Sequence, residues 1–348
     1  MNILNPRIPD ADWDLSGLFT FDHEFSNIMR LGKSFYECDI PIKSIHGCYP
    51  VMWNAGRIVD VKAEFWGDFK TSGPEQVIKF WDNCWTPIGC YLTFSNHLIK
   101  EEHLEDPSSN FLLDILIKHN RRNVNGVIVS SDILSEYIRK KYPQLKQKSS
   151  IIKASVERPH VDGRDFKYYD DLTNRFDRVM VHPDDGHNKE LLEQMAASGK
   201  QDSYEIILNE NCPVGCAVRK PCYAVGARDA IRGWNGMFHL FDFKQEYGAG
   251  GPNPDPRCGR NNYFHPNPAI RTTQRTCNFT QDELEEVYKM GFRHFKLQGR
   301  DDRWEVMFYD FIRYAIEPDH IAPKWMKDSS SLFFSDVPKI PMGVIKEE

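Results

Sequence analysis

The chain has 348 residues, of which 41% are hydrophobic and 27% are charged. This composition is that of a globular protein and excludes a disordered or fibrous chain. The net charge of −6 excludes a generally basic nucleic-acid coat, although it leaves room for a local basic groove. No run of about 18 apolar residues occurs, and the opening MNILNPRIPDADWDL lacks the pattern of a secretory signal. We therefore expect a cytoplasmic protein that does not insert into a membrane.

Short apolar runs typical of strands alternate with helical patterns along the chain. Strands are expected at 44–53, 89–96, 126–131, 149–155, 177–183, 203–212 and 294–300, with a further candidate at 269–275. Helices are expected at 74–85, 111–120, 133–142, 165–176, 187–198, 280–292 and 302–315. Asp132 is in position to cap the helix that follows it. Apolar strands that alternate with helices predict a parallel sheet covered by helices. Eight such units would close a TIM-like (β/α)8 barrel; an open doubly wound sheet is the alternative.

Residues 213–276 interrupt this alternation, and 247–268 are dense in Gly, Pro and Asn. An irregular stretch of this length is uncommon in a compact domain unless it has a function. We therefore expect one barrel domain over 1–327, with a cysteine-containing insertion (213–276) at its C-terminal face. Residues 328–348 would form a C-terminal tail.

Polar side chains at the predicted strand ends are the candidate site residues, because active sites of α/β barrels lie at the C-terminal ends of strands. Lys296, Gln298 and Arg300 would point to one side of the last strand. The candidate catalytic residues are Glu210, His182, Lys153, Lys296 and Arg300. The candidate substrate-binding residues are Thr93, Asn96, Gln298 and Arg57. Arginine suits carboxylate and phosphate through its two-pronged geometry. The alternative is that these side chains are polar only because strand ends are solvated.

The chain has nine cysteines, an odd number that argues against a disulfide framework in a long chain without a secretory signal. Five of them, Cys212, Cys216, Cys222, Cys258 and Cys277, lie in or beside the insertion. Four thiolates suit a [4Fe–4S] cluster or zinc equally well. The preferred metal ligands are Cys212, Cys216, Cys258 and Cys277, with Cys222 and Cys48 as alternatives; free buried thiols are the other interpretation.

Two segments carry a family resemblance. EIILNENCPVGCAVRKPCY (205–223) and TQDELEEVYKMGFRHFKLQGR (280–300) together resemble the collagenase-like peptidase family, and SIHGCYPVMWNAGR (44–57) fits its pattern loosely. The resemblance spans roughly residues 40–315. It implies a barrel that carries a four-cysteine iron–sulfur cluster, as in family members that support hydroxylation of ubiquinone precursors or RNA bases. The segment between Cys222 and Cys277 departs from the peptidase-type members.

Three functions are compatible with these patterns. The first is an iron–sulfur enzyme that hydroxylates, or helps to hydroxylate, a nucleobase or an aromatic ring. Its partners would be a small molecule, RNA or DNA, and the basic runs KHNRRN (118–123) and RKKYPQLKQK (139–148) could bind nucleic acid. The second is a metal-dependent peptidase with Glu210 as base, although no H-E-x-x-H motif occurs. The third is a non-catalytic, metal-stabilised adaptor that pairs with a homologous subunit.

Overall fold

Eight parallel strands form a nearly closed barrel in this computed structural model, which describes residues 2–54, 73–233, 277–299 and 304–318. The order of the strands is β5-β4-β3-β2-β1-β10-β7-β6. They are β1 (Asp12–Ser16), β2 (Ile42–Gly47), β3 (Gly89–Phe94), β4 (Gly126–Val129), β5 (Lys146–Ser149), β6 (Val179–Met180), β7 (Tyr204–Ile207) and β10 (His294–Leu297). The two ends of this order also meet, because the N–H of Ser149 donates to the carbonyl of Arg178 at 2.9 Å. The predicted barrel is therefore confirmed over the open sheet.

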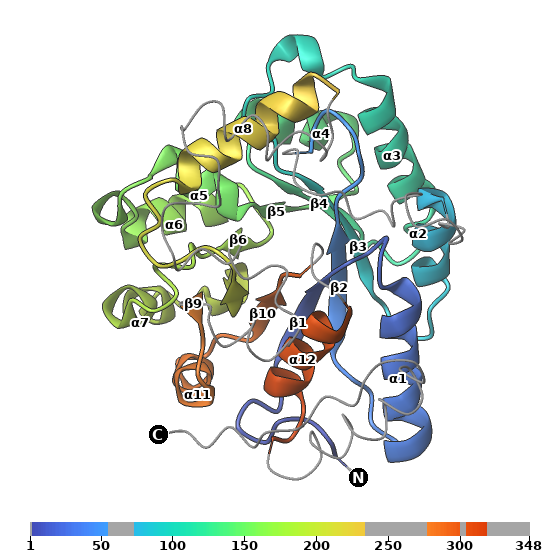
Figure 1. The fold of residues 1–348 in the computed structure, drawn as a ribbon, viewed down its shortest axis with the longest axis vertical. Helices are drawn as coiled ribbons and strands as arrows, with labels where there is room; N and C mark the ends of the chain where they lie inside the picture. The colour runs from blue at the N-terminus through green and yellow to red at the C-terminus, as the bar shows by residue number, and fades with distance from the viewer. Residues whose placement is uncertain (1, 55–72, 234–276, 300–303, 319–348) are drawn as a thin grey trace, which may run out of the picture.

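Helices surround the strands, with α1, α2 and α3 on one flank and α6, α7 and α11 on the opposite flank (Figure 1). The α-helices are α1 (Asp22–Tyr36), α2 (Pro74–Asp82), α3 (Pro107–Lys118), α4 (Asp132–Lys141), α5 (Ile151–Glu157), α6 (Phe166–Thr173), α7 (Lys189–Ala197), α8 (Arg219–Ile231), α11 (Gln281–Lys289) and α12 (Trp304–Ala315). Short 3₁₀ turns lie at Glu101–His103, Val161–Gly163 and Gln201–Ser203. Each helix that the sequence predicts is present.

Polar side chains fix where several of these helices begin. The side chain of Asp165 accepts from the N–H of Tyr168 at the start of α6 at 2.8 Å. Thr280 and Glu283 form a reciprocal capping box at the start of α11. Such caps contribute roughly 0.5–2 kcal/mol each. At α4 the cap is Ser131, whose hydroxyl accepts from Leu134 N–H at 3.3 Å, so the prediction that Asp132 caps this helix is wrong.

Two strand predictions change in the structure. The strand predicted at 149–155 is wrong, because β5 ends at Ser149 and Ile151–Glu157 is the helix α5. Strand β5 lacks the apolar pattern of a buried strand, because its inward side chain is the charged Lys148. The eighth strand of the barrel is β1. It is missing from the sequence-based prediction for the same reason, because its inward side chain is the charged Asp14. The candidate at 269–275 lies outside the described residues.

The middle of the barrel interior holds a buried group of ions. The ammonium of Lys148 on β5 lies 2.5 Å from Asp14 Oδ2 on β1 and 2.7 Å from Glu205 Oε1 on β7. It also donates to the hydroxyl of Ser44 on β2 at 3.1 Å. Lys296 on β10 stands 3.6 Å from Asp14 and 3.7 Å from Glu205. Two cations and two carboxylates from four strands therefore balance one another.

Aromatic and imidazole rings complete the surroundings of these ions. The ammonium of Lys148 lies over the ring of Tyr91 on β3, 4.4 Å from its centroid. The neighbouring position on β4 is Gly126, where a Cβ would lie 2.6 Å from the Tyr91 ring, so only glycine leaves room for it. Nδ1 of His46 lies 2.5 Å from Asp14 Oδ1. Burial alone would raise the pKa of Asp14, but Lys148, Lys296 and His46 hold it well below its usual value.

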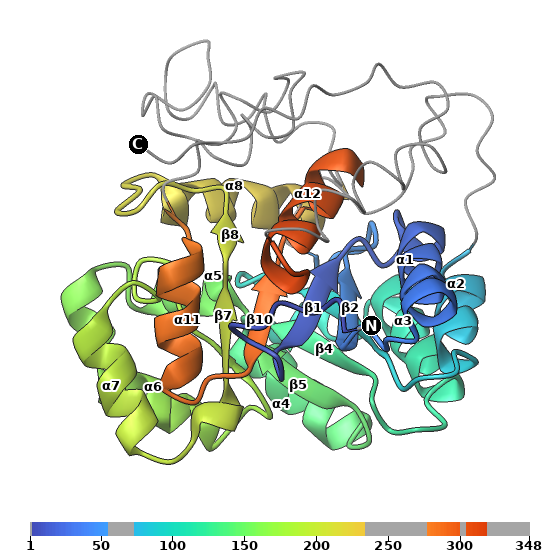
Figure 2. The same ribbon diagram turned by 90° about the horizontal axis from the view of Figure 1, so that it is seen from below.

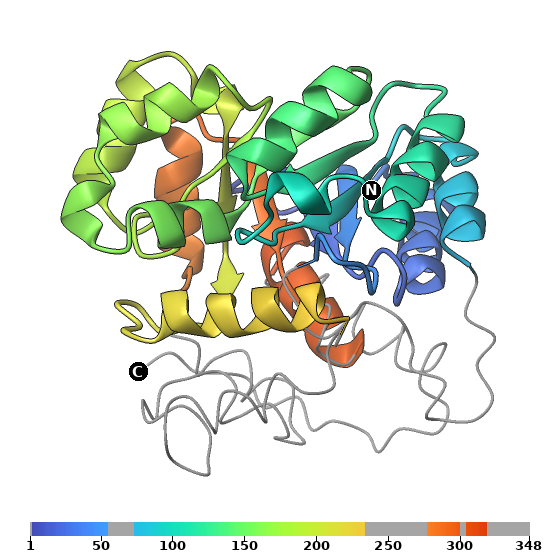
Figure 3. The same ribbon diagram turned by 90° about the horizontal axis from the view of Figure 1, so that it is seen from above.

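A helix of the predicted insertion lies across one end of the barrel. Figures 2 and 3 show α8 extending over the C-terminal ends of the strands. The remaining insertion residues 234–276 and the predicted tail 328–348 lie outside the described residues. In the described parts of the chain, none of the helices combines the length and apolar character needed to cross a bilayer.

We expect Asp14→Asn to lower the free energy of unfolding by about 3–5 kcal/mol, because it leaves buried cations uncompensated. The loss is measured by urea unfolding at neutral pH. Asp14 contributes stability above its unfolded pKa of about 3.9, and this contribution disappears as the pH falls through the lower folded pKa. The deficit of the variant should therefore shrink in acid.

The matched control is Asp39→Asn, since Asp39 pairs with Lys33 at the surface. It should change the free energy of unfolding by less than about 0.5 kcal/mol. Equal effects of the two variants would contradict a structural role for the interior ions.

Candidate functional site

The candidate site lies at the C-terminal mouth of the barrel, between the strand ends and α8. The amide of Asn96, just after β3, donates to the carbonyl of Met52 at 2.8 Å and to that of Ala227 on α8 at 3.0 Å. Tyr223 of α8 packs on Ile152 of α5. Together these contacts fix α8 over the mouth. Asn96, predicted to bind substrate, thus holds this helix through its amide group.

Cations on α8 reach the end of β3. Burial, together with Lys220 and Arg228 of α8, lowers the pKa of His97 to about 4. At the mouth, the cations of α8 therefore lie near the imidazole of His97, which is neutral at pH 7.

His182, Asp184 and Arg219 form one side of the mouth. His182 follows β6, and Arg219 is the first residue of α8. Nη1 of Arg219 lies 2.8 Å from Nε2 of His182 and 3.2 Å from Oδ1 of Asp184. The backbone N–H of Asp184 points at the other ring nitrogen, Nδ1, at 3.2 Å. The Arg219 guanidinium close to the ring opposes protonation of the imidazole, and the neutral ring can accept a hydrogen bond through one of its two nitrogens.

The electrostatics of His182 agree with this geometry. Burial, Arg219 and Arg164 hold the pKa of His182 well below its usual value. The ring is therefore neutral at pH 7. A neutral ring accepts a hydrogen bond from the Arg219 guanidinium and orients it.

A buried network supports the loop that carries His182. The guanidinium of Arg164 binds Asp185 with two contacts, at 2.6 and 3.0 Å. The hydroxyl of Tyr169 donates to Asp185 at 2.5 Å and accepts from the N–H of His182 at 3.0 Å. Asp185 and Arg164 are both almost fully buried. These bonds fix the backbone after β6, so the imidazole is held in a set position.

Glu210 forms the other side of the mouth. It lies on β8 (Asn209–Glu210), which pairs antiparallel with β9 (Cys277–Asn278). Oε1 of Glu210 accepts from the N–H of Cys212 at 2.9 Å and from the amide of Gln298 at 3.2 Å. The side chain is buried, and Oε2 has no hydrogen-bond partner among the described residues. A buried carboxylate oxygen left open is expected to have a functional role or a bound water.

Arg219, Cys212 and Cys277 connect the His182 side of the mouth with the Glu210 side. Burial opposes the charge of Arg219, but interactions with Cys212, Tyr223 and Glu210 raise its pKa. Its Nε–H has no hydrogen-bond partner in the described ranges. The thiol of Cys277 donates to the carbonyl of Cys212 at 3.1 Å. We call His182, Asp184, Glu210, Cys212, Arg219 and Cys277 the mouth cluster.

The described cysteines do not assemble a metal centre by themselves. Burial raises the pKa of the Cys277 thiol to about 12. Cys212, Cys216 and Cys222 are partly exposed. Within the described ranges, no three side chains of His, Cys, Asp or Glu are close enough to hold a metal ion. Cys258 lies outside these ranges, so the four-cysteine [4Fe–4S] or zinc centre stays a prediction.

Uncharged polar groups line the β2–β4 side of the mouth. Among the described residues, the amide of Asn54, the hydroxyl of Thr93 and the hydroxyl of Ser130 are buried without hydrogen-bond partners. Thr93 lies on the same face of β3 as Tyr91, so it points into the barrel. The indole N–H of Trp53 donates to the carbonyl of His103 at 2.8 Å and fixes the loop that carries Asn54. The role of Thr93 in substrate binding stays a prediction.

Other predicted site residues lie elsewhere. Lys153 is on α5 rather than on a strand, and its buried ammonium is paired with Asp132 and Glu157, both at 2.6 Å. Lys296 lies among the interior ions instead of at the mouth. Both assignments assumed that a charged residue near a strand end faces the substrate, whereas each is paired with carboxylates. Gln298 reaches the mouth and binds Glu210. Arg57 and Arg300 lie outside the described residues.

Some features of the site have weak sequence signals. The network of Arg164, Tyr169 and Asp185 comes from three segments that only the fold brings together. Asp184 and Arg219 lie in the sequence near a strand end and near the cysteines, but no sequence pattern links them to His182. The buried Asn54 could be found from its place just after the first predicted strand.

Comparisons with known proteins give a distant structural similarity. No family model matches the chain, and no curated protein matches its sequence. Among solved structures, that of the U32 peptidase Mk0906 is similar, with a TM-score of 0.45 and 13% sequence identity. The similarity covers 83% of this chain and 93% of that chain. A similarity this distant carries no argument about activity, and the resemblance to the collagenase-like peptidase family stays a prediction.

We expect the ring of His182 to be neutral at pH 7, because its pKa is held well below the usual value. In Arg219→Met the neighbouring cation is gone, so the pKa of His182 should rise toward its usual value of about 6.5. The measurement is the pH dependence of the ring ¹⁵N shifts by NMR. Arg30→Met, which removes an exposed arginine on α1, is the control and should leave His182 unchanged. An unaltered titration in Arg219→Met would rule out this electrostatic contact.

Proposed function

We propose that the protein is a hydrolase that cleaves an amide bond of a peptide, with the mouth cluster as its active site. The observation that supports this proposal is the open carboxylate oxygen of Glu210 beside the open Nε–H of Arg219. Amide hydrolysis needs a base that activates water and a donor that stabilises negative charge on the carbonyl oxygen. Glu210 and Arg219 supply these two groups.

The step follows from the contacts of Glu210. Cys212 N–H and Gln298 occupy Oε1, which leaves Oε2 to take a proton from water. The water oxygen attacks the amide carbon, and the Nε–H of Arg219 stabilises the charge that moves to the carbonyl oxygen. The protonated Glu210 then gives its proton to the leaving nitrogen as the C–N bond breaks. His182 and Asp184 are positioning residues, because they orient Arg219.

The β2–β4 side of the mouth suits the neutral part of such a substrate. A peptide offers backbone N–H and C=O groups, and these can bond the open groups of Asn54, Thr93 and Ser130. Buried polar groups left without partners cost about 1–3 kcal/mol each, so a ligand that satisfies them gains affinity.

Glu210→Gln should lower kcat for peptide cleavage by about 100-fold or more, because glutamine cannot act as the base. The amide keeps an oxygen for Cys212 N–H, so the melting temperature should hardly change. Cleavage of a casein digest is measured by the release of new amino groups. Glu136→Gln, at an exposed site on α4, is the control. Wild-type rates in Glu210→Gln, or no cleavage by the wild type, would overturn the proposal.

A second candidate is the iron–sulfur enzyme that hydroxylates a nucleobase or aromatic ring. It is favoured by the position of Cys277 and Cys212 near Arg219, because the charge of Arg219 acts against the rise that burial imposes on the pKa of the Cys277 thiol. Cys212, Cys216, Cys258 and Cys277 would hold the cluster, which would supply redox chemistry at the mouth.

Anaerobically purified protein separates the two candidates. If the second holds, iron and sulfide analysis finds about four of each per chain. Cys212→Ala and Cys216→Ala should then lose the metal, while Cys84→Ala should keep it because Cys84 is not among the predicted ligands and is buried after α2. Metal-free wild type, or equal loading of all three variants, would contradict the cluster.

A further inference from the structure

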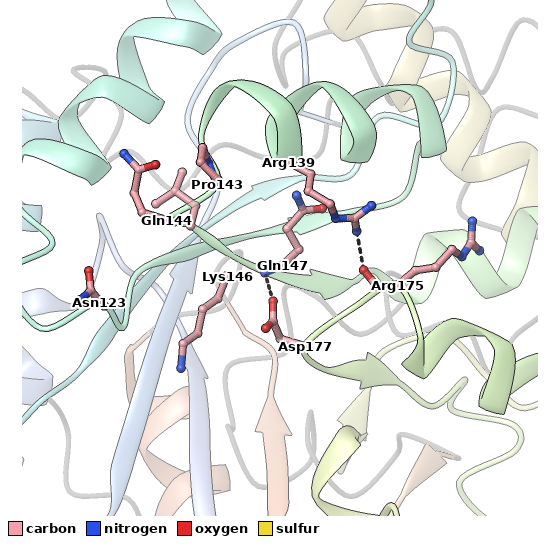
Figure 4. A pocket seen from close by; sticks show the side chains of 9 residues that line it. Asn123, Arg139, Pro143, Gln144, Lys146, Gln147, Arg175 and Asp177 are labelled. Atoms are coloured by element: carbon pink, nitrogen blue, oxygen red, sulfur yellow. Dashed lines mark hydrogen bonds between the residues drawn. The ribbon is translucent and has the colours of Figure 1, made fainter.

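A pocket of about 550 Å³ lies at the end of the barrel opposite to the mouth, where β4, β5 and β6 begin (Figure 4). The end of α4, the start of β5 and the turns before these strands supply its polar lining, which comprises Asn123, Arg139, Gln144, Lys146, Gln147, Arg175 and Asp177. None of these residues takes part in the mouth cluster.

The pocket lining is cationic although the chain as a whole is acidic. Three of the lining residues are basic, and Asp177 is the single acid among them. Oδ2 of Asp177 accepts from the backbone N–H of Gln147 at 2.7 Å, so this carboxylate is already engaged (Figure 4). A net charge of +2 lines the pocket.

The two arginines are held in place and only partly compensated. The guanidinium of Arg139 donates to the carbonyl of Arg175 (Figure 4). Nη1 of Arg175 lies 3.0 Å from Asp132, but the same oxygen also binds the buried ammonium of Lys153 at 2.6 Å. Lys153 has a second carboxylate partner in Glu157, so Arg175 is compensated by Asp132. Arg139, in contrast, contacts only a carbonyl oxygen among the described residues.

The backbone N–H of Lys146 donates to the carbonyl of Asn125, but its side-chain ammonium makes no hydrogen bond or ion pair within the described part of the chain. It is exposed, and it is the first residue of β5. Neighbouring basic residues differ: Lys118 binds Glu75 at 2.6 Å, and Arg121 binds Asp82 at 2.7 Å. The charges of Lys118 and Arg121 are therefore already engaged beside the pocket, whereas the ammonium of Lys146 in the pocket is open.

We propose that this pocket binds the phosphate group of a small phosphorylated molecule. Arginine forks and a lysine ammonium recognise phosphate oxygens, and the amides of Asn123 and Gln144 can donate to them. No aromatic ring lines the described pocket, so stacking of a nucleobase has no support there. The paired charges beside it argue against an extended nucleic-acid track. This site is independent of the proposed hydrolase activity.

The test is calorimetric titration of the full chain with inorganic tripolyphosphate at low salt. Wild type should bind one equivalent, and Lys146→Glu should bind at least about tenfold more weakly, as expected for loss of a charge-assisted contact. Lys167→Glu, the same charge change at an exposed site on α6, should stay within about twofold. Both side chains are exposed, so both variants should keep the wild-type melting temperature.

A parallel titration with single-stranded oligouridine distinguishes nucleic acid from a small phosphate. Tight RNA binding without tripolyphosphate binding would overturn the proposal. So would equal weakening of tripolyphosphate binding by the two variants, or the absence of saturation. Because the measurement is binding, its outcome does not depend on peptide cleavage.

Discussion

The ammonium of Lys148 joins strands of the barrel that are not neighbours in the sheet. It reaches from β5 to Asp14 on β1 and to Glu205 on β7. Removing such charges from water costs several kcal/mol per ion, and the cost is offset only when all partners are present. Lys296 and His46 complete the set. The closure of the barrel and the pairing of these ions therefore depend on each other, because an open sheet would separate the partners.

The interior and the mouth differ in how far their polar groups are satisfied. In the middle layer, each cation faces carboxylates and each carboxylate faces cations. At the mouth, an oxygen of Glu210 and the Nε of Arg219 remain open among the described residues. Buried polar groups in folded proteins are normally bonded, so open groups are concentrated where a ligand or water completes them. This contrast distinguishes the candidate active site from the structural ions below it.

The polar groups at the mouth that lack partners among the described residues lie next to a loop that is held rigidly in place. Asp185 binds Arg164 and Tyr169, and these contacts hold the loop after β6. Catalysis depends on donors that are oriented before the substrate arrives, since reorienting them costs free energy during the reaction. The opposite end of the barrel has a different character: its unpaired charges are exposed and positive. The two ends can therefore recognise different chemical groups.

The sequence alone predicted much of the fold, because apolar strands and amphipathic helices have distinct periods. It failed at β1 and β5, whose inward residues Asp14 and Lys148 break the apolar pattern. At the candidate site, Glu210, His182, Thr93 and Gln298 were predicted from their places at strand ends, and their roles stay predictions.

The local sequence pattern could not distinguish these candidate site residues from Lys153 and Lys296, which also lie near predicted strand ends. Only the tertiary structure showed that both lysines are paired with carboxylates, and that Arg219 meets His182. Residues distant in the chain decide whether a buried charge is compensated, and these partners become neighbours only when the barrel closes.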